Sequence, residues 1–266
     1  MVLGRADDAE AWHELARLGV PDVDRPAHTV VDSIDPGVDE VPANLLRFAV
    51  TFSHAMADGS AAGRIHLLDM SGKELPGTLL GMPPELWDRS RRRLTVLLEP
   101  GRIKRGLQPN VQAGPPLGEG DTVTLVVDPR LRDAGGAELA SGARRTYRVG
   151  APIRCRVDPG LWDLRWPAAP SDPLVVRFDR PLDRALVLRC LRVLDGAGRA
   201  MPGRTSLDAE ARVWAFSPAA GVVASLHIDT RLEDLAGNSV RRVFDRDLQD
   251  AADNGIDDVE VVLAAP

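Results

Sequence analysis

The sequence contains two copies of one pattern, and this internal repeat constrains the fold more than any other feature. With an offset of 126 positions, residues 48–77 and 174–203 align without a gap and share seven of thirty residues. With an offset of 101, residues 124–139 and 225–240 share six of sixteen. The shared residues are apolar residues and turn formers, which a common fold requires. The repeat therefore predicts two copies of one structural unit.

Each copy has the pattern of a β-sheet domain. Apolar residues alternate with small or polar ones over residues 46–53, which is the period of a half-buried strand, and residues 174–178 alternate in the same way. Further short strands follow, separated by turns that contain glycine or proline. Each copy thus has about seven predicted strands in roughly 110 residues, which is typical of a β-sandwich. The sequence thus predicts an all-β protein of two tandem immunoglobulin-like β-sandwich domains.

A series of motifs occurs in the same order in a known family. The motifs are NLLRFAVTFSHAM, LLDMSG, RRLTVLLEPGRIKRG, DPLVVRFDRPLDRAL and LEDLAGN, and the similarity covers residues 40–248. In this order they resemble tandem bacterial immunoglobulin-like domains of the S-layer-associated type. The resemblance implies spacer or adhesive modules of bacterial envelope or secreted proteins, without shared catalytic residues. The first copy departs from the pattern, because Gly136-Ala137 stands where the family has Gly-Asn.

The pattern divides the chain into three parts. Residues 1–28 form an N-terminal segment, residues 29–150 the first sandwich with two loop insertions, and residues 151–266 the second sandwich with an acidic tail. We expect the two domains to join near residues 150–158, where the last strand of the first copy ends and prolines follow. The N-terminal segment is predicted to contain a short amphipathic helix, from the spacing of Trp12, Leu15, Ala16 and Leu18.

Composition argues against several classes of protein. The net charge of −6 gives no general attraction to nucleic acid or to an anionic membrane. No apolar run reaches the roughly 18–20 residues of a membrane span. The first residues lack the basic and apolar regions of a signal peptide, so an envelope, secreted or cytoplasmic location stays open. Cys155 and Cys190 are too few for a disulfide framework and are predicted to be free, buried thiols, with one bridge as the alternative.

The common catalytic motifs do not occur in the sequence. We find no G-x-S-x-G, H-E-x-x-H, P-loop or Rossmann fingerprint, and the five histidines show no metal-ligand spacing. The sequence therefore predicts a non-enzymatic structural or binding module of a bacterial cell envelope or secreted system. Two alternatives remain: a calcium- or glycan-binding adhesion module, and an enzyme with an unrecognised site between the domains.

The repeated Asp-x-x-Gly turn has two interpretations. Asp133 and Asp234 can accept backbone N–H bonds from residues that follow them, and Gly136 and Gly237 supply a positive φ. This makes the turn part of the scaffold. The alternative makes Asp234 and Asn238 calcium ligands.

The first copy carries two insertions, at residues 77–90 and 101–118, and loops on a rigid scaffold often bind ligands. We expect their bases at opposite ends of the sandwich, and so not in one pocket. The candidate binding residues for an anionic glycan or another envelope protein are Arg102, Lys104, Arg105 and Trp87. The alternative is a solvated, basic strand edge. Replacement of residues 102–117 by a Gly-Ser link is expected to cost only about 1–2 kcal/mol of stability.

The acidic tail, residues 245–260, has a faint likeness to a calcium loop, with Gly255 as the turn residue. Calcium is the one cofactor that the sequence suggests, and a solvated acidic linker is the alternative. The candidate ligands are Asp250, Asp253, Asn254 and Asp257.

Overall fold

The computed structural model describes residues 2–8, 11–17, 28–81, 84–170, 172–245 and 255–266. The N-terminal segment forms an antiparallel hairpin of β1 (Val2–Asp8) and β2 (Ala11–Arg17). The predicted helix is therefore wrong. Trp12 and Ala16 pair with Ala6 and Leu3 of β1, and these backbone bonds to a partner strand override a helical spacing of only a few apolar residues.

The first half of the chain, residues 28–150, contains two four-stranded sheets. One has the order β3 (Val31–Asp35), β5 (Arg47–Phe52), β8 (Arg93–Leu97) and β7 (Leu86–Trp87). The other has the order β4 (Glu40–Pro42), β10 (Ala143–Gly150), β9 (Thr122–Val127) and β6 (Ile65–Leu68). Phe48 and Phe52 of the first sheet and Leu125 and Tyr147 of the second lie in one buried cluster. Both sheets thus share a core.

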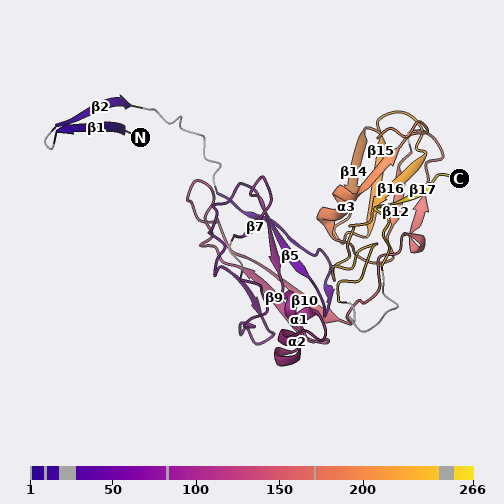
Figure 1. Cartoon of the computed structure of the whole chain (residues 1–266), viewed down its shortest axis with the longest axis horizontal. Helices are drawn as coiled ribbons and strands as arrows, with labels where there is room; N and C mark the ends of the chain where they lie inside the picture. Colours follow the sequence, from indigo (N-terminus) through magenta and orange to yellow (C-terminus); the bar gives the residue numbers. More distant parts are fainter. Residues whose placement is uncertain (1, 9–10, 18–27, 82–83, 171, 246–254) are drawn as a thin grey trace.

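The second half, residues 151–266, repeats this plan with one strand fewer. One sheet has the order β11 (Asp163–Arg165), β12 (Leu174–Arg177), β15 (Val213–Pro218) and β14 (Gly203–Leu207). The other has the order β13 (Leu191–Leu194), β16 (Ser225–Asp229) and β17 (Glu260–Ala264). A second buried cluster includes Phe178, Trp214 and Ile228. Figure 1 shows β5, β9 and β10 in one body and β12 and β14–β17 in another.

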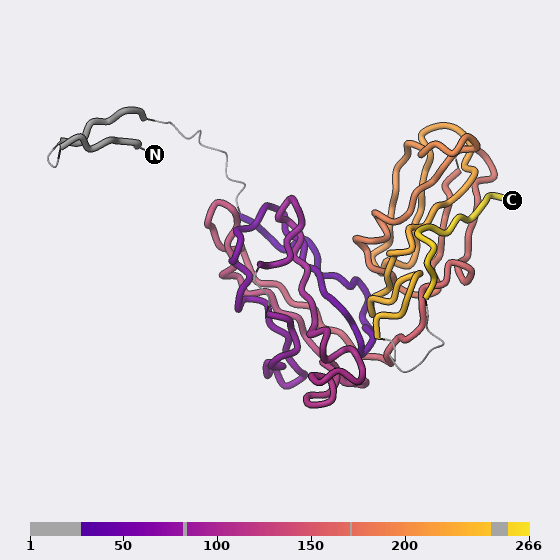
Figure 2. Tube along the Cα trace, viewed as in Figure 1, coloured from indigo at the N-terminus to yellow at the C-terminus, as the bar shows by residue number. Residues whose placement is uncertain are grey.

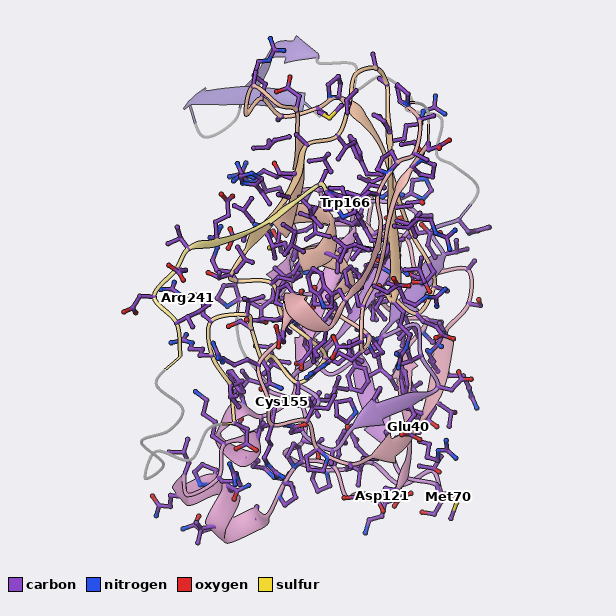
Figure 3. All side chains as sticks on the ribbon, turned by 90° about the vertical axis from the view of Figure 1, so that its right-hand side faces the viewer. Glu40, Met70, Asp121, Cys155, Trp166 and Arg241 are labelled. Carbon is purple, nitrogen blue, oxygen red and sulfur yellow. The ribbon has the colours of Figure 1, made fainter. Side chains whose placement is uncertain are left out.

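The structure repeats the bridges between short segments as well as the strands. Three isolated bridges of the first half recur in the second at the same offsets of 126 and 101. They are Met56–Asp133 with Leu182–Asp234, Arg132–Glu138 with Glu233–Ser239, and Leu68–Glu74 with Leu194–Ala200. Met70, which is 85% exposed, lies at the turn between Leu68 and Glu74 and points outward in Figure 3. The all-β expectation is confirmed.

Strand β17 closes the second half, beside β16 (Figure 2). Residues 239–244 form no strand, because Ser239 and Arg242 bond to each other in a tight turn. Helical segments are short: α1 (Pro100–Ile103), α2 (Gln108–Ala113), a 3₁₀ turn (Pro159–Leu161) and α3 (Arg184–Cys190). Within the described ranges, no helix has the length and apolar character needed to cross a membrane.

Candidate functional site at the junction of the two halves

The repeated Asp-x-x-Gly turn has the same internal geometry in both halves. Asp133 Oδ1 accepts from the N–H groups of Gly135 (2.9 Å) and Ala137 (3.0 Å). Asp234 Oδ1 accepts from the equivalent groups of Ala236 and Asn238, both at 2.9 Å. Gly136 and Gly237 have φ values of 83° and 79°, which a side chain would strain. The turn is therefore built by its own backbone and carboxylate, in agreement with the scaffold interpretation.

The surroundings of the two turns differ. Gly135 and Gly136 are exposed, whereas Asp234 and Asn238 are 1% and 0% exposed. Asn238 Nδ2 donates to Ile153 O (3.0 Å) and to Asp234 Oδ2 (3.1 Å), and its Oδ1 accepts from Phe244 N (3.0 Å). An alanine at this position could make none of these side-chain bonds. The Gly-Asn of the second copy thus ties the segments on either side of the turn together, a role that Ala137 does not have.

Asp234 is a buried carboxylate with a cation beside it. Its Oδ2 also accepts from Arg180 Nη1 at 3.3 Å. Burial raises the pKa of Asp234 to about 6, against the pull of Asn238 and Arg180 toward the charged form. Both oxygens are already bonded, and a cation would have to displace Arg180. The calcium alternative at Asp234 and Asn238 has little geometric support.

The second turn packs directly on the first half. Leu235 belongs to the core cluster of the first half, and its carbonyl accepts from Leu46 N at 3.0 Å. A Cβ on Gly237 would lie 2.4 Å from Leu46 Cδ2, so only glycine fits there without a shift of Leu46. Asn44 holds the connecting segment, because it donates to Ile153 O (2.7 Å) and accepts from Ile153 N (2.9 Å).

Two groups of ion pairs cross the same junction. Arg47 donates to Asp183 at 2.7 Å and also to Glu233. Burial alone would lower the pKa of Arg47, but these two carboxylates raise it above its usual value. Asp35 accepts from Arg93 of its own half (3.1 Å) and from Arg184 of the other (3.2 Å).

A third group of charges lies beside the second insertion. The Asp245 side chain is fully buried and accepts from Arg105 N (3.0 Å), Arg105 Nε (3.4 Å) and Arg154 Nε (2.9 Å). Asp245, Arg105 and Arg154 line a cavity of about 270 Å³ together with Ile103 and Leu117 of the insertion. The insertion therefore takes part in the junction.

The structure places the four predicted binding residues in two different regions. Arg102 donates to the carbonyls of Gly77, Ala113, Gly114 and Pro115 and so holds the loop closed. Lys104 Nζ lies 4.5 Å from the centre of the Phe244 ring, and Arg105 pairs with Asp245. Trp87 lies on β7, where its ring is 5.7 Å from that of Phe52 and its Nε1 donates to Glu85. Arg102 thus stabilises the loop, and Lys104 and Arg105 contact residues of the second half at the junction.

The two insertions meet at one end, contrary to expectation. Arg102 Nη1 donates to Gly77 O at 2.9 Å, and Glu99 N donates to Thr78 O at 2.9 Å. The first insertion runs back along β8, so its beginning lies beside the second insertion and only its end lies at the far end of β8. The expectation considered only the length of the strand between the two insertions. It could not show that the first insertion runs antiparallel to that strand.

Of the predicted calcium ligands in the tail, Asp257 is exposed, and Asp250, Asp253 and Asn254 lie outside the described residues. Within the ranges that the structure covers, no group of His, Cys, Asp or Glu side chains is arranged to hold a metal ion.

The cysteines are free, and only one is buried. Burial raises the pKa of the Cys190 thiol to about 11. Cys155 is exposed on the segment that joins the two halves, as labelled in Figure 3, and its Sγ accepts from Arg180 Nη1 at 3.2 Å. The expectation of two buried thiols is therefore wrong for Cys155, which the sequence places among polar residues of the connection.

A larger cavity, of about 540 Å³, lies beside the first insertion. Its lining includes Leu79, Leu80 and Leu86 of the insertion, Val96 of β8 and Ile65 of β6. The cavity is therefore on the open side between the two sheets of the first half. The insertion could be predicted from the sequence but the cavity could not, because the sequence does not show that β7 pairs with β8 at only two residues.

No family model matches the sequence, and a search of curated proteins gives no match. Among solved structures, the chain is similar to the S-layer protein rSbsC(31-844), at 15% identity and a TM-score of 0.31. That match covers 77% of this chain and 24% of the other. A structure of surface layer protein SbsC, domains 1-6, matches at 15% identity and a TM-score of 0.32, over 89% of this chain and 25% of that one.

Native alpha-2-macroglobulin from Escherichia coli, spanning domains MG0-NIE-MG1, matches at 10% identity and a TM-score of 0.30, over 90% of this chain and 91% of that one. The chain spans about a quarter of the length of the S-layer structures that it matches. TM-scores near 0.3 do not show a common fold over the whole chain.

Proposed function

We propose that the chain is a non-enzymatic structural module in which two immunoglobulin-like β-sandwich domains, residues 29–150 and 151–266, are held in a fixed relative orientation. The observation that carries the proposal is the docking of the second turn on the first half, with Leu235 inside the first core. Domains that move independently each have a core of their own, so a residue of one domain would not be buried in the core of the other.

The charges at the junction support the same role. Arg47, Asp35 and Asp245 each bond to at least one side chain of the other half. Buried, paired charges of this kind favour one geometry over others, because any misalignment leaves a charge without its partner. A rigid two-domain unit suits a spacer in a bacterial envelope or secreted system, which is also what the sequence resemblance implies. Its partner would be another envelope protein.

The proposal is tested by small-angle X-ray scattering on two matched glycine variants. Gly237→Ala strains the second turn and also pushes a Cβ against Leu46. Gly136→Ala strains the equivalent turn at a similar φ, but its Cβ meets no other atom within 4 Å. We expect the wild-type protein and Gly136→Ala to scatter as one fixed shape, and Gly237→Ala to give a broader distribution of distances.

Scattering of the wild-type protein that requires many relative orientations would contradict a rigid spacer. Calcium provides a check of the adhesion alternative, since a ligand of the native state raises its melting temperature. We expect equal melting temperatures in calcium chloride and in EDTA. A rise in calcium would favour the acidic tail as a metal site.

A further inference from the structure

The cavity beside the first insertion has the size and lining of a small-molecule site. Its volume of about 540 Å³ lies within the range of roughly 300–1,000 Å³ that such sites occupy. Leucine, valine, isoleucine, alanine and proline side chains make most of its wall. In the part of the chain that the structure describes, the ionisable residues of the lining are Asp58, Glu74 and Glu85, all carboxylates.

The second half shows what this place looks like without an insertion. There β14 pairs with β15 at five successive residues, from Gly203 to Leu207, and covers the edge of the sheet. In the first half β7 pairs with β8 only at Leu86 and Trp87. The first insertion thus replaces a continuous edge strand by a short strand and a cavity.

One carboxylate holds the cavity open. Glu85 accepts from the backbone N–H groups of Gly59 (3.0 Å), Ala61 (2.7 Å) and Ala62 (2.8 Å), and from Trp87 Nε1 (2.6 Å). The three backbone bonds fasten the insertion to the loop on the opposite wall, and the bond to Trp87 lies within the insertion. A site that is fixed before the ligand arrives loses less entropy on binding.

The other two carboxylates lie at the mouth of the cavity. The side chain of Asp58 is 77% exposed and that of Glu74 is 60% exposed. Asp58 is 3.7 Å from Arg91, a loose pair, and Glu74 bonds to His66 at 3.0 Å. An apolar interior below an acidic mouth complements a ligand with an apolar body and one positive charge.

The edge of β8 leaves no room for an added peptide strand. Leu80 N bonds to Leu97 O at one end, and Leu86 pairs with Thr95 at the other. Only one residue of β8 lies between these pairs, so a peptide could not form the run of backbone bonds on which strand addition depends. The occupant that fits is therefore a small molecule.

We propose that this cavity binds a small amphiphilic cation, with its apolar body against the leucines of the insertion and its charge at Asp58 and Glu74. The site is independent of the junction, so the rigid-spacer proposal stands or falls separately.

The probes for the test are octyltrimethylammonium and octanoate, which have chains of similar length and opposite charge, each used below its micelle concentration. We expect calorimetry to show one site that binds the cation at least about tenfold more tightly than the anion. Tetramethylammonium, which has the charge without the apolar body, should not bind measurably.

Two variants test the place of binding. Thr95→Phe and Gly81→Leu each add volume to the lining, and the Cβ of Gly81 meets no atom within 4 Å. We expect both to weaken binding of octyltrimethylammonium at least about tenfold. Circular dichroism shows whether each variant is folded. If Thr95→Phe is unfolded, the binding measured with Gly81→Leu alone tests whether the cavity is the site.

Two further variants test the charge. Asp58→Asn with Glu74→Gln should reduce the preference for the cation over the anion. Glu138→Gln with Asp163→Asn removes the same charge from exposed positions outside the cavity and should leave the preference unchanged. Equal affinity for both probes, or undiminished binding in Gly81→Leu, would overturn the proposal. Binding of an amidated Leu-Leu-Lys peptide where both small probes fail would overturn it in favour of a peptide occupant.

Discussion

The backbones of the two halves come close together at Gly37. A Cβ at this position would be 1.8 Å from Ala209 O, an overlap that only movement of the backbone can remove. We expect Gly37→Ala to lower the free energy of unfolding by about 1–3 kcal/mol, because overpacking forces such shifts. Urea denaturation measures the change. Gly196→Ala is the control, since its Cβ meets nothing within 4 Å; equal losses in both variants would show that the junction is not involved.

Asp234 gives the junction a dependence on pH. Its pKa is raised to about 6, so between about pH 4 and pH 6 the folded protein keeps a proton that the unfolded chain has lost. The contribution of this residue to stability is therefore complete below pH 4 and falls as pH rises through 6. The upper limit of the change is about 3 kcal/mol.

Urea denaturation across this range, on the wild-type protein and on Asp234→Asn, measures the effect. The variant has no carboxyl group at this position to titrate. From pH 4 to pH 6, the free energy of unfolding of the wild-type protein should therefore fall steadily relative to that of the variant. If the free energy of unfolding of the wild-type protein instead rises relative to that of the variant, the pair with Arg180 stabilises the charged form of Asp234 by more than burial destabilises it.

At the scale of elements, the 101–118 loop is less dispensable than its sequence suggests. Ile103 and Leu117 are 3% and 1% exposed and belong to the first core. Replacement of residues 102–117 by a Gly-Ser link should therefore cost more than the expected 1–2 kcal/mol, since loss of each large core side chain costs about 2–5 kcal/mol. Replacement of residues 107–113 alone, which are largely exposed, should cost much less. Thermal unfolding of the two deletion variants compares them, and equal melting temperatures would contradict a core role for the loop ends.

Local features of the fold could be predicted from the sequence, and features that depend on distant partners could not. The turns at Asp133 and Asp234 follow from a carboxylate and a glycine a few residues apart. The N-terminal hairpin and the turn at Ser239 are local exceptions, because periodicity does not reveal which neighbouring backbone groups bond to each other. The roles of Arg102 and Arg105 were missed for the same reason, because a basic run has the same sequence whether it meets solvent, carbonyl groups or Asp245.

At the scale of the whole molecule, the shared core should couple the unfolding of the two halves. Leu235 and Phe244 of the second half pack on the first core. We expect a single transition in guanidinium chloride for the wild-type protein, and two transitions for Arg47→Ala, which leaves Asp183 and Glu233 without that partner. Tryptophan fluorescence follows mainly the second half, which has three of the five tryptophans. If the wild-type protein and Arg47→Ala both unfold in a single transition at the same denaturant concentration, the pairs of Arg47 with Asp183 and Glu233 do not couple the unfolding of the two halves.

The connecting segment provides a second measure of the junction. Asn44 bonds to both the N–H and the carbonyl of Ile153, so the segment near residues 150–158 is held against the first half. Limited proteolysis should cut the wild-type protein slowly and yield two resistant fragments that separate near residue 150. Asn44→Ala should be cut faster at the same place. A first cut near residue 100 would contradict the division into two domains.

The position of β17 also has a consequence for synthesis on the ribosome. The sheet of the second half is completed by residues 260–264, and the core of the first half by residues 235 and 244, made long after its own last strand. Neither half can reach its final packing while the chain is still short of these residues. The nascent protein therefore exposes incomplete apolar surfaces until residue 264 has been made, and its yield should depend on chaperones that shield such surfaces.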